Sequence, residues 1–248
     1  MVLKLLRRAK AKGKASLPEG MRVYAIGDIH GCDKQLKKLL KAIGKDLEGY
    51  DGESHLVFLG DYVDRGPDSK GVIERLVSKK LPGDKQHFLL GNHEEAMMNV
   101  MDGTSKRAND WLSFGGRQMM ESYGVGKREL YEAGGDVGAL LRDVMPKSHR
   151  KFFEKLELMK QIGGYLFVHA GIRPGVPLEE QEQSDLIWIR DRFLKSDRDH
   201  GVVVVHGHTI TEKPQNKANR IGVDTGCYAT GQLTAVRLQG SERAFITV

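Results

Sequence analysis

The chain has 248 residues, of which 40% are hydrophobic and 29% charged, a composition typical of a soluble globular protein. Its two cysteines are too few for a disulfide framework, and its apolar runs are too short to span a bilayer. Disulfide-stapled secreted scaffolds and membrane-spanning proteins are therefore excluded, and we expect one large α/β domain in the cytoplasm.

The formal net charge of +6 is concentrated at the start of the chain. Residues 1–20 contain six basic residues and one acidic residue, Glu19, so the rest of the chain is close to neutral. We interpret residues 1–20 as a flexible basic arm and residues 21–248 as a single folded domain. Contact of the arm with nucleic acid, anionic lipid or an acidic partner, and a role as a transit peptide, are the alternatives.

Short, continuous apolar runs predict the strands, because such runs occur where both faces of a sheet are covered. Five of them lead directly into a polar residue. These five are Arg22–Gly27, His55–Gly60, Gln86–Gly91, Gly164–Val168 and Gly201–Val205. Three further strands are expected near the end of the chain, at Arg220–Val223, Gln232–Leu238 and Arg243–Val248.

Apolar residues at helical spacing predict helices between the first strands. One helix is expected after Asp33 and another after Ser69, with these residues as N-caps, and Pro82 should stop the second. The alternation of strands and helices indicates a layered α/β fold. Residues 95–161 have a less regular helical pattern, and we expect them to form a helical insert or cap.

An Asp, Asn or His residue follows each of the five runs. In an open α/β sheet the functional site lies beyond the carboxyl ends of the strands, so these side chains are expected to meet. Any one alone would be interpreted as a turn or structural residue, but five equivalent positions favour a shared site. The residues are Asp28, His30, Asp61, Asn92, His169 and His208.

These residue types indicate a metal centre. Carboxylate, amide and imidazole ligands suit Mn²⁺, Fe or Zn²⁺, and we expect Mn²⁺. Asp28 and His30 lie two residues apart at a strand end, so both should project to one side and bind one ion together with Asp61. The other three residues would bind a second ion, and the two oxygens of Asp61 could bridge the pair. Two such ions would hold a hydroxide between them and polarise a phosphoryl oxygen.

Residues beside these ligands indicate where a substrate would bind. His93 directly follows a proposed ligand, so its ring should diverge toward a leaving group and act as a general acid. Asp64 is a candidate to hydrogen-bond this imidazole and keep it protonated. Arg65 offers a planar fork that matches a phosphate dianion, and Arg190 is preferred to Arg192 as a second fork.

Five motifs in chain order resemble a known family. They are GDIHG (27–31), GDYVDRG (60–66), GNHE (91–94), HAG (169–171) and HGHT (206–209). They look like the successive blocks of the phosphoprotein phosphatase family, which belongs to the calcineurin-like metallophosphoesterases. The first three blocks together are highly specific, and the match runs from about residue 22 to residue 235. The compact length, and IWIR followed by GHT and VDTG, resemble the bacterial and phage branch.

The resemblance implies a catalytic domain of two mixed β-sheets that pack together and are flanked by helices. It implies the same six metal ligands, with Asp61 shared between two ions. It implies no metal contact for His206, for which we expect a supporting or structural role.

The resemblance also implies the residues of the substrate side. His93 would be the acid with Asp64 behind it, Arg65 and Arg190 would bind phosphate, and Asn92 would lie next to the substrate. The choice of Arg190 over its neighbouring arginine, which spacing alone leaves open, is settled by the family's motif.

We therefore predict a metal-dependent phosphomonoesterase in which a metal-bridged hydroxide attacks phosphorus in line. The predicted activity is that of a protein serine/threonine phosphatase, with a phosphoprotein or a phosphorylated small molecule as substrate. The alternative is symmetrical hydrolysis of a dinucleoside polyphosphate such as diadenosine tetraphosphate. Asp64 and Glu94 favour the phosphatase, because the similar diadenosine tetraphosphatases commonly lack the first acid and carry Asp at the second position.

Two other classes fit less well. A binding module on an inactive scaffold should have lost a ligand or the acid, and all are present. A nuclease needs a basic face that the near-neutral domain lacks, so nucleic acid is not expected as a partner. The aromatic residues Trp111, Phe114 and Tyr123 of the insert are expected in the core, with a place in the substrate cleft as the alternative. The sequence makes no prediction of oligomeric state.

Overall fold

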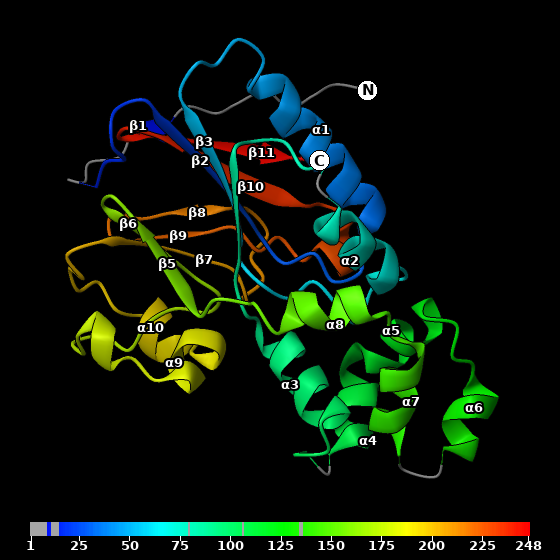
Figure 1. Ribbon diagram of the computed structural model, residues 1–248. Helices are drawn as coiled ribbons and strands as arrows, with labels where there is room; N and C mark the ends of the chain where they lie inside the picture. The colour runs from blue at the N-terminus through cyan, green and yellow to red at the C-terminus, as the bar shows by residue number, and fades with distance from the viewer. Residues whose placement is uncertain (1–8, 11–14, 79, 106, 134–135) are drawn as a thin grey trace.

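A computed structural model of the chain describes residues 9–10, 15–78, 80–105, 107–133 and 136–248. Two β-sheets pack face to face, and helices cover their outer faces (Figure 1). A lobe of helices extends from one end of these layers. The predicted fold of two mixed sheets flanked by helices is confirmed.

The first sheet has six strands in the order β1-β11-β10-β2-β3-β4. Their bounds are β1 (Ala9–Lys10), β2 (Met21–Ile26), β3 (Glu53–Phe58), β4 (Lys85–Phe88), β10 (Thr234–Gln239) and β11 (Glu242–Thr247). Strands β2, β3 and β4 run parallel, with Ile26 paired to Phe58 and Phe58 paired to Phe88. These three strands therefore end at one level, and the loops that follow them lie side by side.

The second sheet has five strands in the order β5-β6-β7-β9-β8. Their bounds are β5 (Met159–Ile162), β6 (Tyr165–Val168), β7 (Val203–His206), β8 (Gln215–Asn216) and β9 (Arg220–Gly222). Strands β6, β7 and β9 are parallel, and the two outer strands are antiparallel to their neighbours. Strands β1, β5 and β8 were not predicted, because their sequences AK, MKQI and QN contain no continuous apolar run.

The cores follow the alternation of side chains along the strands. Tyr24 and Ile26 of β2 pack under helices α1 (Asp33–Asp46) and α2 (Ser69–Val77), whereas Val23 and Ala25 face the second sheet. On its other face the second sheet packs against α9 (Gln183–Trp188) and α10 (Asp191–Leu194). The result is a helix–sheet–sheet–helix arrangement of layers.

The helical lobe comprises residues 92–153, which lie within and just before the predicted insert. Its helices are α3 (Asn92–Met101), α4 (Ala108–Trp111), the kinked segment η1 (Leu112–Gly116), α5 (Arg117–Ser122), α6 (Lys127–Glu132), α7 (Val137–Val144) and α8 (Lys147–Phe153). A 3₁₀ turn, η2 (Leu178–Glu180), and a short helix, α11 (Cys227–Thr230), complete the described helices. That the lobe acts as an insert or cap stays a prediction.

Both predicted N-caps differ from the observed ones by one position. Asp68, and not Ser69, caps α2, since its side chain accepts a hydrogen bond from the Gly71 N–H at 2.8 Å. Asp33 is the first residue of α1 and pairs with Arg75 of α2, with Nε and Oδ1 2.6 Å apart. Helix α2 already ends at Val77, before Pro82.

Part of the predicted arm packs against the sheets. Strand β1 pairs with β11, the Leu17 N–H donates to the Gly240 carbonyl at 3.0 Å, and the Ala15 and Leu17 side chains are buried. These contacts differ from the predicted boundary after Gly20. Residues 1–8 and 11–14, with most of the basic side chains of the arm, lie outside the described residues, so their role stays a prediction.

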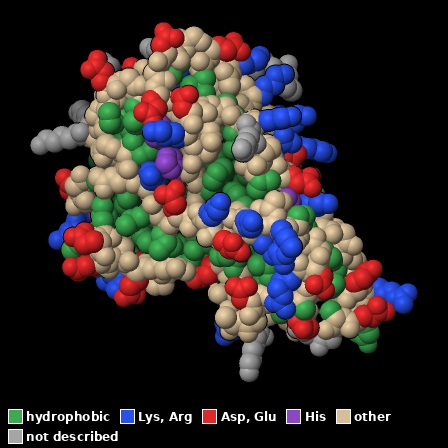
Figure 2. All heavy atoms as spheres, viewed as in Figure 1, with side chains coloured by type: hydrophobic (Ala, Val, Ile, Leu, Met, Phe, Trp, Pro, Cys, Tyr) green, Lys and Arg blue, Asp and Glu red, His purple; other side chains and the backbone are tan. Residues whose placement is uncertain are grey.

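Basic side chains are not confined to the arm. Figure 2 shows Lys and Arg gathered along α1 and where the helical lobe joins the sheets. Within the described residues, no helix is both long and apolar enough to cross a membrane.

Candidate metal centre

The six predicted ligands meet where the parallel strands of both sheets end. They are supplied by the loops after β2, β3, β6 and β7 and by the first residue of α3, and all six side chains are buried. The loops are joined through their backbones: the N–H groups of Ile29 and His30 both donate to the Asp61 carbonyl, at 3.0 and 2.8 Å. Likewise the Gly207 N–H donates to the His169 carbonyl at 2.8 Å. Backbone hydrogen bonds thus connect neighbouring site loops within each sheet.

Backbone strain in the described chain is concentrated in these loops. Five described residues other than glycine have a positive φ, between 44° and 70°, a region that side chains with a Cβ adopt at an energetic cost. They are His30, Asp61, Asp64, Arg65 and His208. All five are predicted site residues, so the strain is found where side chains must be aimed at a common centre.

Asp61 lies between two groups of imidazoles. Its Oδ2 is 3.4 Å from His30 Nε2, and its Oδ1 is 3.5 Å from His169 Nε2. Donor atoms within 4.8 Å of one another form two sets, one of His30, Asp61 and His93 and the other of Asp61, His169 and His208. Because Asp61 belongs to both sets through different oxygens, its carboxylate is placed to bridge two ions.

The protonation of the histidines explains why these sets fit a cation. His30 Nδ1 lies 2.8 Å from the Val63 carbonyl, and His169 Nδ1 lies 2.8 Å from the Leu59 carbonyl. A carbonyl can only accept, so each Nδ1 carries the hydrogen and each Nε2 turns a lone pair toward Asp61. Two acceptors facing each other repel unless a cation lies between them.

Burial keeps these imidazoles neutral. It lowers the pKa of His30 to about 3 and the pKa of His208 to about 2, and it also lowers the pKa of His169. Neutral imidazole is the form that binds metal. His169 Nε2 also lies 2.9 Å from Asn92 Oδ1 and 3.2 Å from His208 Nδ1. With Asn92, the second set therefore contains four residues that could each offer a ligand atom to a metal ion.

Asp28 lies beside these sets and within neither of them. Both of its oxygens accept from the His208 N–H, at 3.1 and 3.0 Å. Burial, and then repulsion from Asp224 and Asp61, raises the pKa of Asp28 well above its usual range. Asp224, which we did not predict, has its pKa raised to about 6 by burial. A cation held by the donor sets would stabilise the ionised form of these buried carboxylates.

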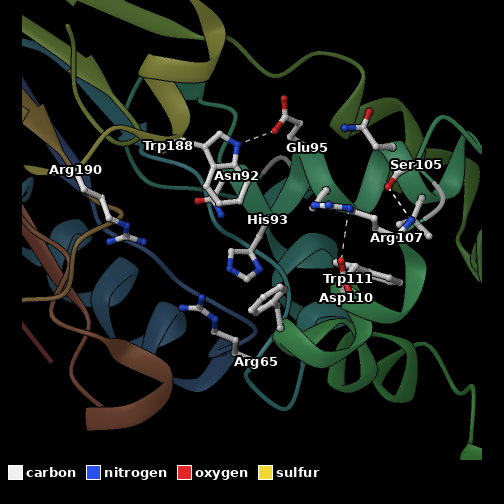
Figure 3. Close-up of a pocket in the computed structure, with 14 residues that line it drawn as sticks. Arg65, Asn92, His93, Glu95, Ser105, Arg107, Asp110, Trp111, Trp188 and Arg190 are labelled. Atoms are coloured by element: carbon white, nitrogen blue, oxygen red, sulfur yellow. Dashed lines mark hydrogen bonds and ion pairs between the residues drawn. The ribbon is translucent and has the colours of Figure 1, made fainter. Parts of the chain in front are cut away.

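His93 and Asp64 form a close pair next to the metal ligands. His93 Nδ1 is 2.7 Å from Asp64 Oδ2. Burial lowers the pKa of His93, but the charges of Asp61 and Asp64 outweigh it and the net shift is upward. The ring points between the guanidinium groups of Arg65 and Arg190, so a proton on it faces open space (Figure 3).

That space is a cavity of about 410 Å³, lined by His93, Asn92 and the two arginines. Arg190 is held in place because its Nη1 donates to the His208 carbonyl and to Thr209 Oγ1, both at 3.2 Å. The Arg65 guanidinium lies 4.9 Å from the centre of the Tyr228 ring. The remaining lining residues are Glu95, Ala96, Asn99, Val100, Ser105, Arg107, Asp110, Trp111, Phe114 and Trp188.

His206 and Arg192 lie outside these groups. The His206 ring is buried, with Nδ1 3.1 Å from the Gly207 carbonyl and an edge contact to Phe193 at 5.2 Å between ring centres. Arg192 is exposed and is not among the residues that line the cavity. A supporting role for His206 stays a prediction.

Glu94 is a site residue whose role the sequence did not reveal. Its buried carboxylate accepts the N–H groups of Asp61 and Tyr62 at 2.8 Å, Val63 at 3.2 Å and Gly91 at 3.1 Å. It therefore fixes the loop that carries Asp61. Burial raises its pKa to about 8. A Cβ at position 91 would collide with Asp61 Oδ1, which explains the glycine in GNHE.

The three aromatic residues of the lobe have three different environments. Tyr123 is buried and its hydroxyl is 2.8 Å from His149 Nδ1, as a core residue. Phe114 is 66% exposed and lines the cavity, so the expectation of a core position is wrong for this residue. Trp111 is buried, yet its Nε1 donates to Asp64 Oδ2 at 3.0 Å. It belongs to both the core and the site.

Known proteins are similar to this chain in sequence and in fold. The model of the calcineurin-like phosphoesterase family matches residues 21–236. A bis(5'-nucleosyl)-tetraphosphatase PrpE (asymmetrical) of Oceanobacillus iheyensis is 27% identical over 92% of both chains. Serine/threonine-protein phosphatase 1 of Salmonella typhimurium is 28% identical over 88% of this chain and 92% of its own. A solved structure described as a candidate diadenosine tetraphosphatase superposes with a TM-score of 0.63 at 25% identity and covers 92% of both chains.

Proposed function

The chain belongs to the calcineurin-like phosphoesterase family, and we propose that within this family of metal-dependent phosphoester hydrolases it is a phosphatase for phosphoserine and phosphothreonine in proteins. The observation that carries the proposal is the buried pair of His93 and Asp64, 2.7 Å apart, beside the donor sets. A serine or threonine alkoxide is a poor leaving group and needs a proton as it departs. Cleavage inside a dinucleoside polyphosphate releases a nucleoside phosphate, which is a good leaving group and departs without a proton.

Two divalent ions, for which we propose Mn²⁺, would be held by the six ligands named above. Asp28, His30 and Asp61 would hold one, and Asp61 would share the other with Asn92, His169 and His208. When bound, such a pair of ions supplies Lewis-acid activation of water and neutralises charge on the phosphoryl group.

The other site residues bind the substrate and move a proton. Arg65 and Arg190 extend into the cavity from two sides and would hold the phosphate oxygens. His93 would give the proton on its outer nitrogen to the leaving oxygen, while Asp64 holds the Nδ1–H and stabilises the charged ring. Asn92, at the cavity wall, would serve both a metal ion and the substrate.

A dinucleoside tetraphosphate is the second candidate substrate. Two of the relatives named above carry that activity in their names, and the cavity extends past the phosphate arginines to Phe114, Trp188 and Arg107. Aromatic faces and a third guanidinium would suit a nucleobase and a further phosphate. If a dinucleoside tetraphosphate is the substrate, the proton of His93 should contribute little to the reaction.

A comparison of kcat/KM on a phosphoserine peptide and on diadenosine tetraphosphate tests the proposal. We expect the peptide to be preferred, and we expect Asp64→Asn to slow the peptide reaction at least about tenfold through loss of a charge-assisted hydrogen bond. Arg192→Ala is the matched control, since Arg192 is exposed outside the cavity, and should change neither rate. A strong preference for the nucleotide together with an unaffected Asp64→Asn variant would replace the first candidate by the second.

A further inference from the structure

Trp111 of the helical lobe contacts the carboxylate of the acid pair. Its indole Nε1 donates to Asp64 Oδ2 at 3.0 Å, and the same oxygen lies 2.7 Å from His93 Nδ1. The Asp64 side chain is completely buried, and its Oδ1 has no hydrogen-bond partner among the described residues. Both described side-chain donors to this carboxylate therefore converge on one oxygen, one from α3 and the other from α4.

The second donor matters because a buried carboxylate without water is unstable as an anion. Burial raises the pKa of Asp64, and the hydrogen bonds from His93 and Trp111 act against that rise. Loss of the indole N–H would leave His93 as the single donor to Oδ2. The carboxylate would then be oriented less firmly toward His93 Nδ1 and would stabilise the charged ring less.

The turn that follows Trp111 is shaped to reach the same site. Gly115 has a φ of 120°, which is open to glycine, and its carbonyl accepts from the Arg65 N–H at 3.1 Å. A Cβ on Gly115 would collide with Arg65, and a Cβ on Gly116 would collide with the Trp111 ring. The helical path is therefore interrupted by a kink at Gly115, between α4 and α5. Residues 111–116 thus touch both the acid pair and a phosphate arginine.

We propose that Trp111 is a positioning residue for the general acid: its indole N–H orients Asp64, which in turn holds His93 ready to protonate the leaving group. The inference rests on the proposed function, since it requires an acid-assisted phosphoester cleavage. It also gives α4 a task, because this helix supplies a second donor to the carboxylate beside His93 of α3. In the competing interpretation Trp111 is a core residue and its N–H is incidental.

Substrates with different leaving groups distinguish the two interpretations. Trp111→Phe keeps an aromatic ring in the core and removes the donor. Tyr123→Phe is the matched control, because Tyr123 is a buried aromatic residue of the same lobe that bonds to His149 and lies outside the cavity lining. Both variants are assayed as the full chain with saturating Mn²⁺, and bound metal is measured for each.

For Trp111→Phe we expect kcat on a phosphoserine peptide and on phenyl phosphate to fall about tenfold, the effect of losing one hydrogen bond to a charged group. The rate on 2,4-dinitrophenyl phosphate, whose leaving group needs no proton, should stay within about twofold. The KM and the metal content of Trp111→Phe should not change. Tyr123→Phe should keep the rates of the unmodified protein on all substrates. In a His93→Asn background, adding Trp111→Phe should have no further effect, because the two residues act through one step.

Two results would overturn the inference. One is an equal loss of rate on all three substrates, which indicates a structural role. The other is a tenfold loss that persists in the His93→Asn background. Failure of the proposed function gives a different result, because the unmodified protein would then show no metal-dependent hydrolysis, or no dependence on the leaving group.

Discussion

Asp61 faces a lone pair on either side, from His30 Nε2 and from His169 Nε2. The Glu94 carboxylate accepts the Asp61 N–H, and Asp64 and Arg65 follow Asp61 in the chain with positive φ angles. None of these arrangements is favourable by itself. Each becomes reasonable if cations occupy the space between the acceptors, because the gain from coordination then compensates for burial and strain.

The His93→Asn variant tests the acid at this scale. The amide cannot carry the proton, so hydrolysis of a phosphoserine peptide should fall by about 10²–10⁴, the usual contribution of a general acid. Metal content should be unchanged, and 2,4-dinitrophenyl phosphate should be affected far less. Parallel measurement of kcat on the two substrates checks this, and unchanged turnover of the peptide would remove His93 from the role of acid.

Residue-level prediction from the sequence succeeded where position along a strand carries the information. Asp28, Asp61 and His169 directly follow buried strands, and that is sufficient to place them at one edge. Trp111 and Glu94 could not be placed in this way. The contact of Trp111 joins residues 47 positions apart, and that of Glu94 depends on the shape of a loop 32 positions away.

At the scale of elements, the first turn of α3 links the parts of the molecule. Each of its four residues has a contact elsewhere in the chain. Asn92 contacts His169, His93 contacts Asp64, and Glu94 accepts the Asp61 N–H. Glu95 accepts from Trp188 Nε1 and from Gln183 Nε2, both at 2.9 Å. This helix, the first of the lobe, thereby contacts the site loops of both sheets and α9. The sequence predicted helical structure from residue 95, three residues after its actual start, because the polar residues of the first turn carry no apolar periodicity.

His149 of α8, which contacts Tyr123 at the end of α5, predicts that the free energy of unfolding depends on pH. Burial lowers the pKa of His149, so the folded chain keeps this imidazole neutral, whereas the unfolded chain protonates it near pH 6.5. Glu74 of α2, which raises this pKa, and Lys70, which lowers it, are the charged groups nearby. The unfolded state thus binds the extra proton, and the stabilising contribution is complete above about pH 6.5 and decreases as the pH falls.

His149→Gln should therefore flatten the fall in unfolding free energy between about pH 7 and pH 5, by at most about 1.4 kcal/mol per pH unit for one proton. Denaturant unfolding of metal-loaded protein at several pH values measures this. Tyr123→Phe keeps the imidazole and should retain the slope of the unmodified protein. Equal slopes for His149→Gln and the unmodified protein would show that this group is not linked to folding.

At the scale of the whole molecule, the layers bring the ends of two sheets to one place and leave the lobe beside it. The alternation of apolar runs and amphipathic helices predicted a layered α/β fold, and the family resemblance implied the two mixed sheets flanked by helices. The position of the lobe did not follow, since irregular helices do not reveal which face they cover. The segment before β2 was also misjudged in part: its charges suggested a solvated arm, while Ala15 and Leu17 are buried.

The central claim is that this fold holds two divalent cations and uses them to hydrolyse phosphoesters. Its most direct test is the hydrolysis of 4-nitrophenyl phosphate by chelator-stripped protein during titration with Mn²⁺, with bound metal measured on the same samples. We predict negligible activity without metal and full recovery at about two ions per chain. Full activity in metal-free protein, or activity that saturates with Mn²⁺ while no bound metal is detected, would contradict a reaction that depends on two bound cations.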